Sequence, residues 1–245
     1  MNANRTTRPG RRGFLLIAGA STASLAAGLP LAAFAAGTRI GVIGSGRVGG
    51  TVGELWVKAG HEVMFSSLDL EYDKALAARI GGGARAGTTR EAAAFGEALF
   101  FAVPYAALPS LGRELADAIK GKVVLDACNP IPARDGDMAV AARAKGTGVA
   151  SPELLPGARI VRAFNCVSYA MMKSEAHRAG EKLGIPLAAD DGAALKVAIL
   201  LVQEAGFEPV VVGGLDRAKD FDYGTPIFGK PMTAAEVRRI LGVKG

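Results

Sequence analysis

The chain has few of the residues that build metal sites, disulfide frameworks or base-stacking surfaces. Its 245 residues include two cysteines, two histidines, one tryptophan and only 6% aromatic residues. No Cys-x-x-Cys or His-x-x-x-His pattern occurs, so the sequence predicts no metal site. Half of the residues are hydrophobic, and the core must therefore be built mainly from Ala, Val, Leu and Ile. This composition favours a buried parallel sheet covered by helices.

Acidic residues are absent from the first 35 positions, which hold Arg5, Arg8, Arg11 and Arg12. The formal charge of +6 is concentrated there, because the rest of the chain has 25 basic residues (29 less these four) and 23 acidic ones. A nearly neutral domain without a basic stripe lacks the electrostatic footprint of a nucleic-acid-binding protein. We therefore expect no nucleic-acid partner.

The amino-terminal segment has the layout of a secretory signal. A basic stretch over residues 1–13 precedes the apolar stretch Phe14–Leu29, and small residues favour cleavage after Ala35. Arg11 and Arg12, followed by Gly-Phe-Leu, resemble a twin-arginine signal. The apolar stretch is short for a stable membrane span. We predict a twin-arginine signal peptide over residues 1–35 and export to the periplasm by that machinery, with tethering if the signal stays uncleaved. A basic tail followed by a core helix is the alternative.

A glycine-rich loop follows the first predicted strand, Arg39–Ile43. The loop has the form G-x-G-x-x-G and comprises Gly44, Ser45, Gly46, Arg47, Val48 and Gly49. A helix is predicted at Val48–Ala59 and a second strand at Glu62–Phe65, which is the context that dinucleotide-binding loops require. The first glycine permits a tight turn, the second leaves room for a pyrophosphate, and the third lets the helix pack on the strand. We predict that this loop binds a nicotinamide dinucleotide.

The end of the second strand governs the choice between NAD and NADP. The usual ribose-binding acid would fall at Ser67, and a phosphate-binding arginine would often fall at Leu68. The hydroxyls of Ser66 and Ser67 could bind a 2′-phosphate, and a carboxylate that would repel it is missing from the usual position. Asp69 could instead bind a ribose hydroxyl of NAD. The sequence favours NADP, with NAD as the alternative.

Further apolar runs alternate with helical patterns along the chain. Strands are predicted at Ala98–Val103, Lys122–Ala127, Arg159–Phe164, Leu187–Ala189 and Glu208–Val212, and helices at Ala106–Ile119 and Gly192–Ala205. This alternation predicts a doubly wound, mostly parallel α/β Rossmann sheet of about eight strands with helices on both faces. We assign residues 36–215 to this domain and residues 216–245 to a carboxyl-terminal extension packed on it.

Several short motifs occur in the order found in one known family. They are Ala-Gly-His-Glu-Val at 59–63, Val-Pro at 103–104, Leu-Asp-Ala-Cys-Asn-Pro at 125–130, Val-Arg-Ala-Phe-Asn at 161–165, Asp-Asp at 190–191 and Gly-Phe-Glu-Pro-Val at 206–210. Over about residues 38–215 the chain resembles the coenzyme F-420-dependent NADP oxidoreductases. Their nucleotide-binding domain is shared by membrane ferric reductases and pyrroline-carboxylate reductases.

The resemblance implies hydride transfer between a nicotinamide and a flavin or a deazaflavin such as coenzyme F-420. By position, it places Val103, Pro104, Asn129, Pro130 and Asn165 around the nicotinamide. The chain departs from the family in two respects. The arginine after Ser67 is missing, and the tail from position 216 differs from the family's usual ending.

Other polar residues and the cysteines are predicted to be structural. His61 begins the second strand, away from the ligand crevice, and Asp191 suits the N-cap of the following helix rather than a metal site. His177 lies in a polar stretch, with a substrate contact as the alternative. Cys128 and Cys166 are expected to be buried free thiols, with a disulfide as the alternative.

Two functions remain open on the sequence. One is an exported NAD(P)-dependent oxidoreductase that uses a small-molecule electron acceptor, and the other is a non-catalytic NAD(P)-binding module that serves as a sensor or carrier. No nucleophile–base pair stands out, which agrees with hydride transfer, because this reaction needs two stacked rings rather than a strong acid or base. A homodimer is compatible with either function.

Overall fold

The structure is a computed structural model that describes residues 1–2 and 37–244. The predicted signal peptide, with its paired arginines, its apolar stretch and its cleavage position, falls on residues outside this description. Within the described residues, no helix has both the length and the apolar character needed to cross a membrane.

An eight-stranded sheet runs through the molecule in the order β3-β2-β1-β4-β5-β6-β7-β8. All neighbouring strands are parallel except β6 and β7, which pair antiparallel through Arg162 and Ala188. The predicted mostly parallel Rossmann sheet is therefore confirmed. The strands are β1 (Arg39–Ile43), β2 (Glu62–Ser66), β3 (Ala84–Ala86), β4 (Ala98–Phe101), β5 (Val123–Asp126), β6 (Arg159–Arg162), β7 (Gly184–Ala188) and β8 (Glu208–Gly213).

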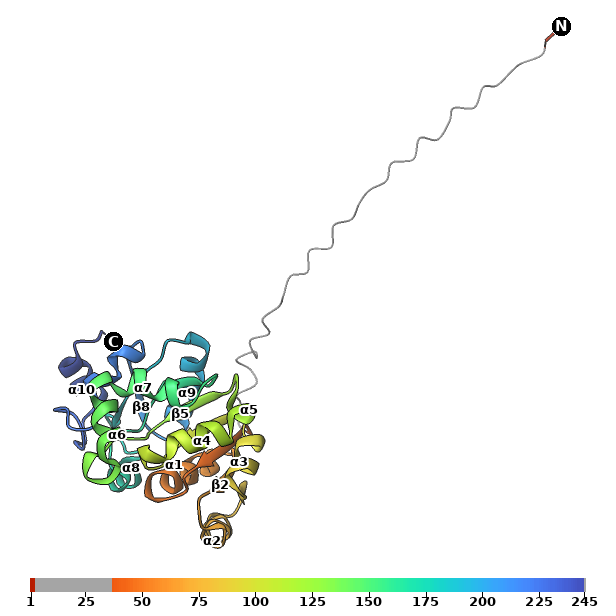
Figure 1. Ribbon diagram of the computed structural model, residues 1–245. Helices are drawn as coiled ribbons and strands as arrows, with labels where there is room; N and C mark the ends of the chain where they lie inside the picture. The colour runs from red at the N-terminus through yellow and green to blue at the C-terminus, as the bar shows by residue number, and fades with distance from the viewer. Residues whose placement is uncertain (3–36, 245) are drawn as a thin grey trace.

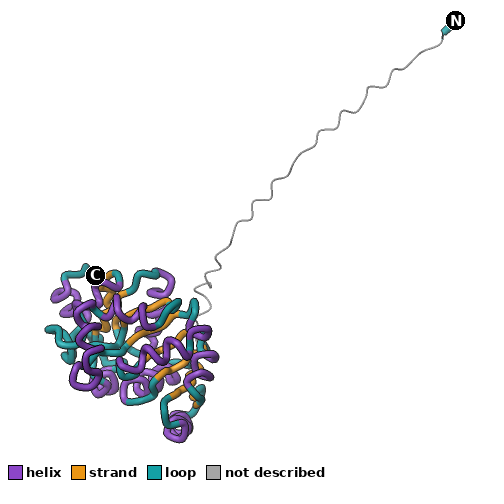
Figure 2. Tube along the Cα trace, viewed as in Figure 1, coloured by secondary structure: helices purple, strands orange, loops and turns teal. Residues whose placement is uncertain are grey.

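Helices cover both faces of the sheet, and the strands lie between them (Figures 1 and 2). Successive strand residues divide between two cores: Phe100 packs with α1 and α9 on one face, and Phe101 packs with α3, α4 and α7 on the other. This alternation follows from the two-residue period of a strand. The helices are α1 (Arg47–Lys58), α2 (Leu70–Ile80), α3 (Thr89–Phe95), η2 (Tyr105–Ala107), α4 (Leu108–Glu114), α5 (Ala116–Ile119), α6 (Pro132–Lys145), α7 (Thr147–Leu154), α8 (Tyr169–Glu175), α9 (Gly192–Glu204), η3 (Leu215–Asp220) and α10 (Ala234–Leu241).

The element boundaries differ from the sequence predictions in several places. Strands β4, β5 and β6 end before the apolar runs do, because the chain leaves the sheet there to form turns. The helix predicted at 106–119 is three shorter pieces, with a break at Leu115, whose φ and ψ are −102° and 9°. The short strand β3 and several alanine-rich or polar helices were not predicted. Capping boxes at Thr88–Glu91 and Thr233–Glu236 mark the starts of α3 and α10 and could have revealed them.

The carboxyl-terminal segment after β8 packs on the last two strands. Ala218, Phe221 and Val237 form a buried cluster with Val210 and Val212 of β8. The backbone N–H of Gly229 donates to the carbonyl of Cys166 at 2.7 Å, which ties this segment to the turn after β6. In Figure 1 the segment and α10 lie at the end of the molecule opposite α2. The tail thus reaches the turn after β6, although it is remote in sequence.

The residues predicted to be structural have packing partners. The His61 side chain is buried, and its Nε2 lies 2.9 Å from Oε2 of Glu204 at the end of α9. His177 donates its backbone N–H to Gly206 and packs against that glycine, so it supports the turn into β8. Asp191 caps α9 by accepting the N–H groups of the first turn, as predicted.

Candidate functional site

The glycine loop between β1 and α1 has three glycines, and the space around the Cα atom differs at each of them. Gly44 has a φ of 100°, and a Cβ there would lie 2.6 Å from the carbonyl oxygen of Ala102. A Cβ on Gly49 would lie 1.9 Å from the carbonyl oxygen of Gly44, so this glycine allows α1 to pack against the loop. A Cβ on Gly46 would meet no atom within 4 Å. Gly44 and Gly49 are required by the fold, whereas Gly46 faces open space.

The open space at Gly46 lies at the amino terminus of α1. Gly46 is the N-cap residue, no side chain caps the helix, and no acidic residue occurs in its first turn. The free N–H groups and the helix dipole of such a terminus favour an anion. The loop therefore fits the pyrophosphate of a dinucleotide, with Gly46 leaving the room that a side chain would fill.

The predicted turns lie in one row along the carboxyl ends of the strands. Val103, after β4, packs against the glycine loop, since its Cγ1 would lie 2.7 Å from a Cβ on Gly44. Cys128, after β5, belongs to the buried cluster against which Val103 packs. The side-chain N–H of Asn129 donates to the carbonyl of Asn165, after β6, at 2.7 Å. Parallel sheets bind ligands along this edge, so the row lies where a ligand of such a fold is expected to extend from the glycine loop.

The two predicted asparagines differ in their surroundings. Asn129 is half-buried, and its Oδ1 is shielded from solvent with no hydrogen-bond partner. This orphaned acceptor fits an amide donor such as the carboxamide of nicotinamide. Asn165 is only 3% exposed, its side-chain N–H donates to the carbonyl of Phe221 at 3.2 Å, and its Oδ1 is likewise buried without a hydrogen-bond partner. Its side chain therefore holds the carboxyl-terminal segment. Pro104 is exposed and Pro130 is buried at the same edge.

A buried ion network supports this row from behind, and the sequence did not predict it. Arg162 at the end of β6 is fully buried between Asp126 Oδ2, at 2.8 Å, and Asp222 Oδ1, at 3.0 Å. Burial alone would lower the pKa of the guanidinium, but the two carboxylates outweigh it and hold that pKa above its usual value. Thr147 donates its hydroxyl and backbone N–H to Asp222. Because Asp222 comes from the segment after β8, no local motif indicates the network.

The end of β2 contains a second group that sequence analysis missed. Ser66 is fully buried and donates its hydroxyl to the Val42 carbonyl at 2.8 Å, so it faces the sheet. Ser67 donates to Oδ2 of Asp73 at 2.9 Å. The other oxygen of Asp73 accepts the hydroxyl of Ser45 in the glycine loop. Asp73 belongs to α2 and is fully buried, and its position in a charged helical stretch gave no indication of this role.

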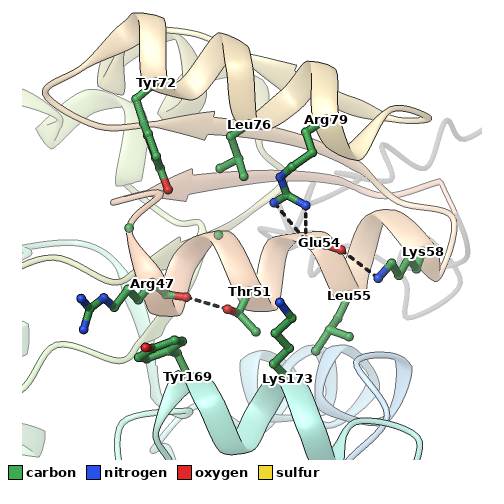
Figure 3. A pocket seen from close by; sticks show the side chains of 12 residues that line it. Arg47, Thr51, Glu54, Leu55, Lys58, Tyr72, Leu76, Arg79, Tyr169 and Lys173 are labelled. Carbon is green, nitrogen blue, oxygen red and sulfur yellow. Dashed lines mark hydrogen bonds and ion pairs between the residues drawn. The ribbon is translucent and has the colours of Figure 1, made fainter.

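A hollow of about 340 Å³ lies between α1, α2 and α8 (Figure 3). Its lining residues include Gly46, Tyr72 of α2 and Tyr169 of α8. The Arg47 guanidinium lies 5.3 Å from the ring centre of Tyr169 and points away from the hollow in Figure 3. None of the turns after β4, β5 and β6 lines this hollow. It therefore adjoins the expected pyrophosphate position and is separate from the nicotinamide end.

A smaller hollow of about 200 Å³ lies at the other end of the row, beside Pro130. Arg143 and Lys219 line it, and among the described residues neither has an ion-pair partner. The Arg143 guanidinium lies 5.2 Å from the ring centre of Tyr223. The carboxylate of Asp222 also lines the hollow, but it is neutralised by Arg162. The two free cations suit an anionic group of a small molecule.

Both cysteines are free and buried in the structure, as predicted. Burial raises the pKa of the Cys166 thiol to about 12 and that of Cys128 well above its usual value. The part of the chain that the structure describes holds no cluster of three or more histidine, cysteine or acidic residues suited to a metal ion. The site therefore offers backbone N–H groups, hydroxyls and amides.

Comparisons with known proteins agree with this geometry. Residues 39–130 match the family model described as NADP oxidoreductase, coenzyme F420-dependent. A search of curated proteins finds no significant match. Among solved structures, a hypothetical protein from Sinorhizobium meliloti is 23% identical with a TM-score of 0.69, over 80% of this chain and 95% of its own. A putative F420-dependent NADP reductase from Arthrobacter sp. FB24 is 21% identical with a TM-score of 0.63, over 80% of this chain and 100% of its own.

A longer protein shares the same fold. An imine reductase from Myxococcus stipitatus, solved with NADP⁺, is 16% identical with a TM-score of 0.53, over 84% of this chain and 60% of its own. At these identities the solved structures establish the fold alone, and the family match covers the strands and the loop that would hold the dinucleotide. The chain contains an NAD(P)-binding, oxidoreductase-like domain.

Proposed function

We propose that the protein is an NAD(P)H-dependent oxidoreductase that transfers a hydride between a nicotinamide and a flavin- or deazaflavin-like acceptor. The observation that carries this proposal is the open amino terminus of α1 at Gly46, at the same edge of the sheet as the turns that end β4, β5 and β6. The matched family, described as coenzyme F420-dependent, supports the class of acceptor.

The protein's own residues would bind and orient the two rings. The bound dinucleotide supplies the hydride chemistry, and the protein supplies position and a water-poor surrounding. The N–H groups that begin α1 would hold the pyrophosphate, and Asn129 Oδ1 would accept the carboxamide N–H groups. Val103, Pro104 and Pro130 would form apolar walls around the nicotinamide. No acid or base is needed at the reacting carbon.

The acceptor would lie at the Pro130 end of the row. Arg143 and Lys219 there would bind an anionic group of the acceptor, and the ring of Tyr223 lies beside them. Flavin nucleotides and deazaflavin cofactors carry phosphate groups in addition to a flat ring system. An anionic, ring-containing acceptor therefore fits both the charge and the position of this hollow.

Turnover separates this proposal from the alternative of a non-catalytic NAD(P)-binding module. Purified protein loaded with reduced dinucleotide would be mixed with flavin mononucleotide or coenzyme F-420 without oxygen, and the absorbance of the reduced nicotinamide would be followed. Its decay, absent with heat-denatured protein, supports an oxidoreductase. Tight binding without decay for either acceptor would favour the sensor or carrier.

We also propose export, which is carried by the sequence of residues 1–35. Twin-arginine systems transport folded proteins, so the dinucleotide could be bound in the cytoplasm and carried across the membrane. Mass spectrometry of protein recovered from periplasmic and cytoplasmic fractions would locate the mature amino terminus. An intact chain found only in the cytoplasm would contradict export.

A further inference from the structure

We infer that Asp73 makes the site select NADH over NADPH, the reverse of what the sequence favours. This inference rests on the proposed dinucleotide function and concerns the adenosine end of the same site. Its basis is the buried carboxylate of Asp73, which accepts hydrogen bonds from two serines. Ser45 lies in the glycine loop, and Ser67 follows the end of β2.

The Asp73 carboxylate is buried directly behind Ser67, the position at which the ribose-binding group of such a fold is expected. Its two oxygens accept the hydroxyls of Ser45, in the glycine loop, and Ser67, after β2. The side chain is fully buried, so solvent does not screen it. The usual position of the ribose-binding acid is occupied by Ser67. Asp73 of α2, six residues later, instead places a carboxylate next to it.

The hydrogen bonds of Ser67 leave it unable to donate to a phosphate. A serine hydroxyl has one hydrogen, and that of Ser67 has two acceptors within the protein, Asp73 Oδ2 at 2.9 Å and the Asp69 carbonyl oxygen at 3.2 Å. One lone pair accepts the backbone N–H of Asp69 at 3.1 Å. The remaining lone pair can accept a hydrogen bond from the ribose 2′-hydroxyl of NADH. The oxygens of a 2′-phosphate carry no such hydrogen at neutral pH and would face only a lone pair.

The other groups at this end do not replace the missing donor. Ser66 is buried and bonded to Val42. Leu68 is fully exposed at the position where the family has its arginine. In the following helix, Lys74 is paired with Glu71 at 2.8 Å, and Arg79 is paired with Glu54. Neither of these two cations of α2 is therefore free to pair with an added phosphate.

Binding titrations test the inference without relying on turnover. NADH and NADPH would be titrated into the wild-type protein, followed by nicotinamide fluorescence and checked by calorimetry. We expect NADH to bind at least about tenfold more tightly than NADPH. Tighter binding of NADPH would overturn the inference while leaving the proposed function intact. Failure of both nucleotides to bind would overturn the proposed function and this inference together.

Two variants address the hydrogen-bond assignment itself. Ser67→Ala removes only a hydroxyl that points to Asp73, so NADPH affinity should change by less than about threefold. A selective loss of NADPH binding of about tenfold would show that Ser67 donates to the phosphate, and would overturn the inference. Asp73→Asn presents an amide N–H to Ser67 and frees the serine hydrogen, so NADPH affinity should rise about tenfold.

The control for Asp73→Asn is Glu62→Gln, which removes one negative charge from an exposed ion pair with Arg85 at the opposite end of β2. It should alter the NADH-to-NADPH ratio by less than about threefold. Circular dichroism would establish whether Asp73→Asn folds, and Ser67→Ala decides the assignment if it does not. An equal rise in NADPH affinity in both charge variants would show a general field effect and overturn the specific role of Asp73.

Discussion

The two ends of the proposed crevice are built in different ways. At the glycine-loop end, backbone groups face the expected ligand, and the fold needs glycines at Gly44 and Gly49 to place them. At the nicotinamide end, the turns after β5 and β6 are held by a buried network of side chains, Arg162, Asp126 and Asp222. The three glycines of the first end are close neighbours in the sequence, and one side chain from a distant element, Asp73 of α2, bonds to the loop. The other end depends on residues that only the complete fold brings together.

This difference predicts how each end fails. A backbone site loses ligand when space is filled, while the rest of the domain stays folded. A buried ion network loses stability when one partner is removed, because buried hydrogen-bond donors are left without an acceptor inside the protein. The comparison can therefore be tested by measuring stability and binding separately for variants at each end.

The largest effect is expected for Asp222→Ala. The variant leaves the buried Arg162 with one carboxylate partner in place of two, and it removes the acceptor of Thr147. Asp126 still balances the Arg162 charge, so the cost comes from donors left without an acceptor, namely Arg162 Nη2 and the hydroxyl and backbone N–H of Thr147. Each unsatisfied buried donor costs about 1–3 kcal/mol, so a total of roughly 3–5 kcal/mol is expected. Urea denaturation followed by circular dichroism would measure the change in unfolding free energy. The matched control is Asp220→Ala, which breaks a partly exposed pair with Arg217 nearby and should cost about 0–1 kcal/mol. Similar losses in both variants would contradict the role of the network.

Two glycine variants should separate folding from binding at the other end. Gly49→Ala places a Cβ 1.9 Å from the Gly44 carbonyl oxygen, so the unfolding free energy should fall by about 1–3 kcal/mol or more through overpacking.

Gly46→Val fills open space, so its unfolding free energy should change by less than about 1 kcal/mol. Its binding of NADH should fall about 100-fold, and the thermal shift on adding the nucleotide should disappear. An undiminished thermal shift in Gly46→Val would refute the assignment of the loop.

Sequence reasoning succeeded where local pattern and fold coincide. The glycine spacing, the apolar runs of the strands and the Asp191 cap follow from contacts between near neighbours, and the structure confirms them. The predicted turn residues Val103, Asn129 and Asn165 also lie in one row, because parallel strands end at a common edge.

The missed features arise from contacts between distant segments. In the sequence, Asp73 is one of several charged residues of a helix. Its role depends on the packing of α2 against the glycine loop, where it accepts the hydroxyl of Ser45. Asp222 reaches Arg162 only because the segment after β8 packs back on the sheet. The sequence predicts a phosphate contact for Ser66, because two adjacent serines do not reveal which of them points toward the ligand at the end of a strand. The Ser66 hydroxyl instead bonds within the sheet.

A smaller effect is expected at the hollow beside Pro130. Arg143→Ser removes a cation that has no ion-pair partner among the described residues. The KM for flavin mononucleotide should rise about tenfold, while the KM for NADH stays within about twofold. Steady-state rates with each substrate varied would show the split. Arg113→Ser, an exposed arginine beside a different hollow, is the control. A parallel rise in both KM values would show that Arg143 contributes to the nicotinamide end instead.

The smallest effect concerns Cys128 and Cys166, which lie just behind the row of turns. Burial raises the pKa of both thiols, that of Cys166 to about 12, whereas an unfolded chain has thiol pKa values of about 8.5. Above about pH 8.5 the unfolded chain loses thiol protons that the native protein keeps, so the unfolding free energy must fall as pH rises toward the native pKa. We expect a loss of about 1 kcal/mol per thiol between pH 8 and pH 9.5 in urea titrations.

The variant Cys166→Ala should remove its share of that pH-dependent loss, although it also lowers stability at pH 8 by truncating a buried side chain. A thiol reagent at pH 8 should react slowly with the native protein, because the reactive thiolate is scarce there, and should find two thiols after denaturation without reductant. Detection of none in the unreduced, denatured protein would mean that the cysteines had formed a disulfide. In that case the end of the crevice formed by the turns after β5 and β6 would be held by a covalent bond as well as by the Arg162 network.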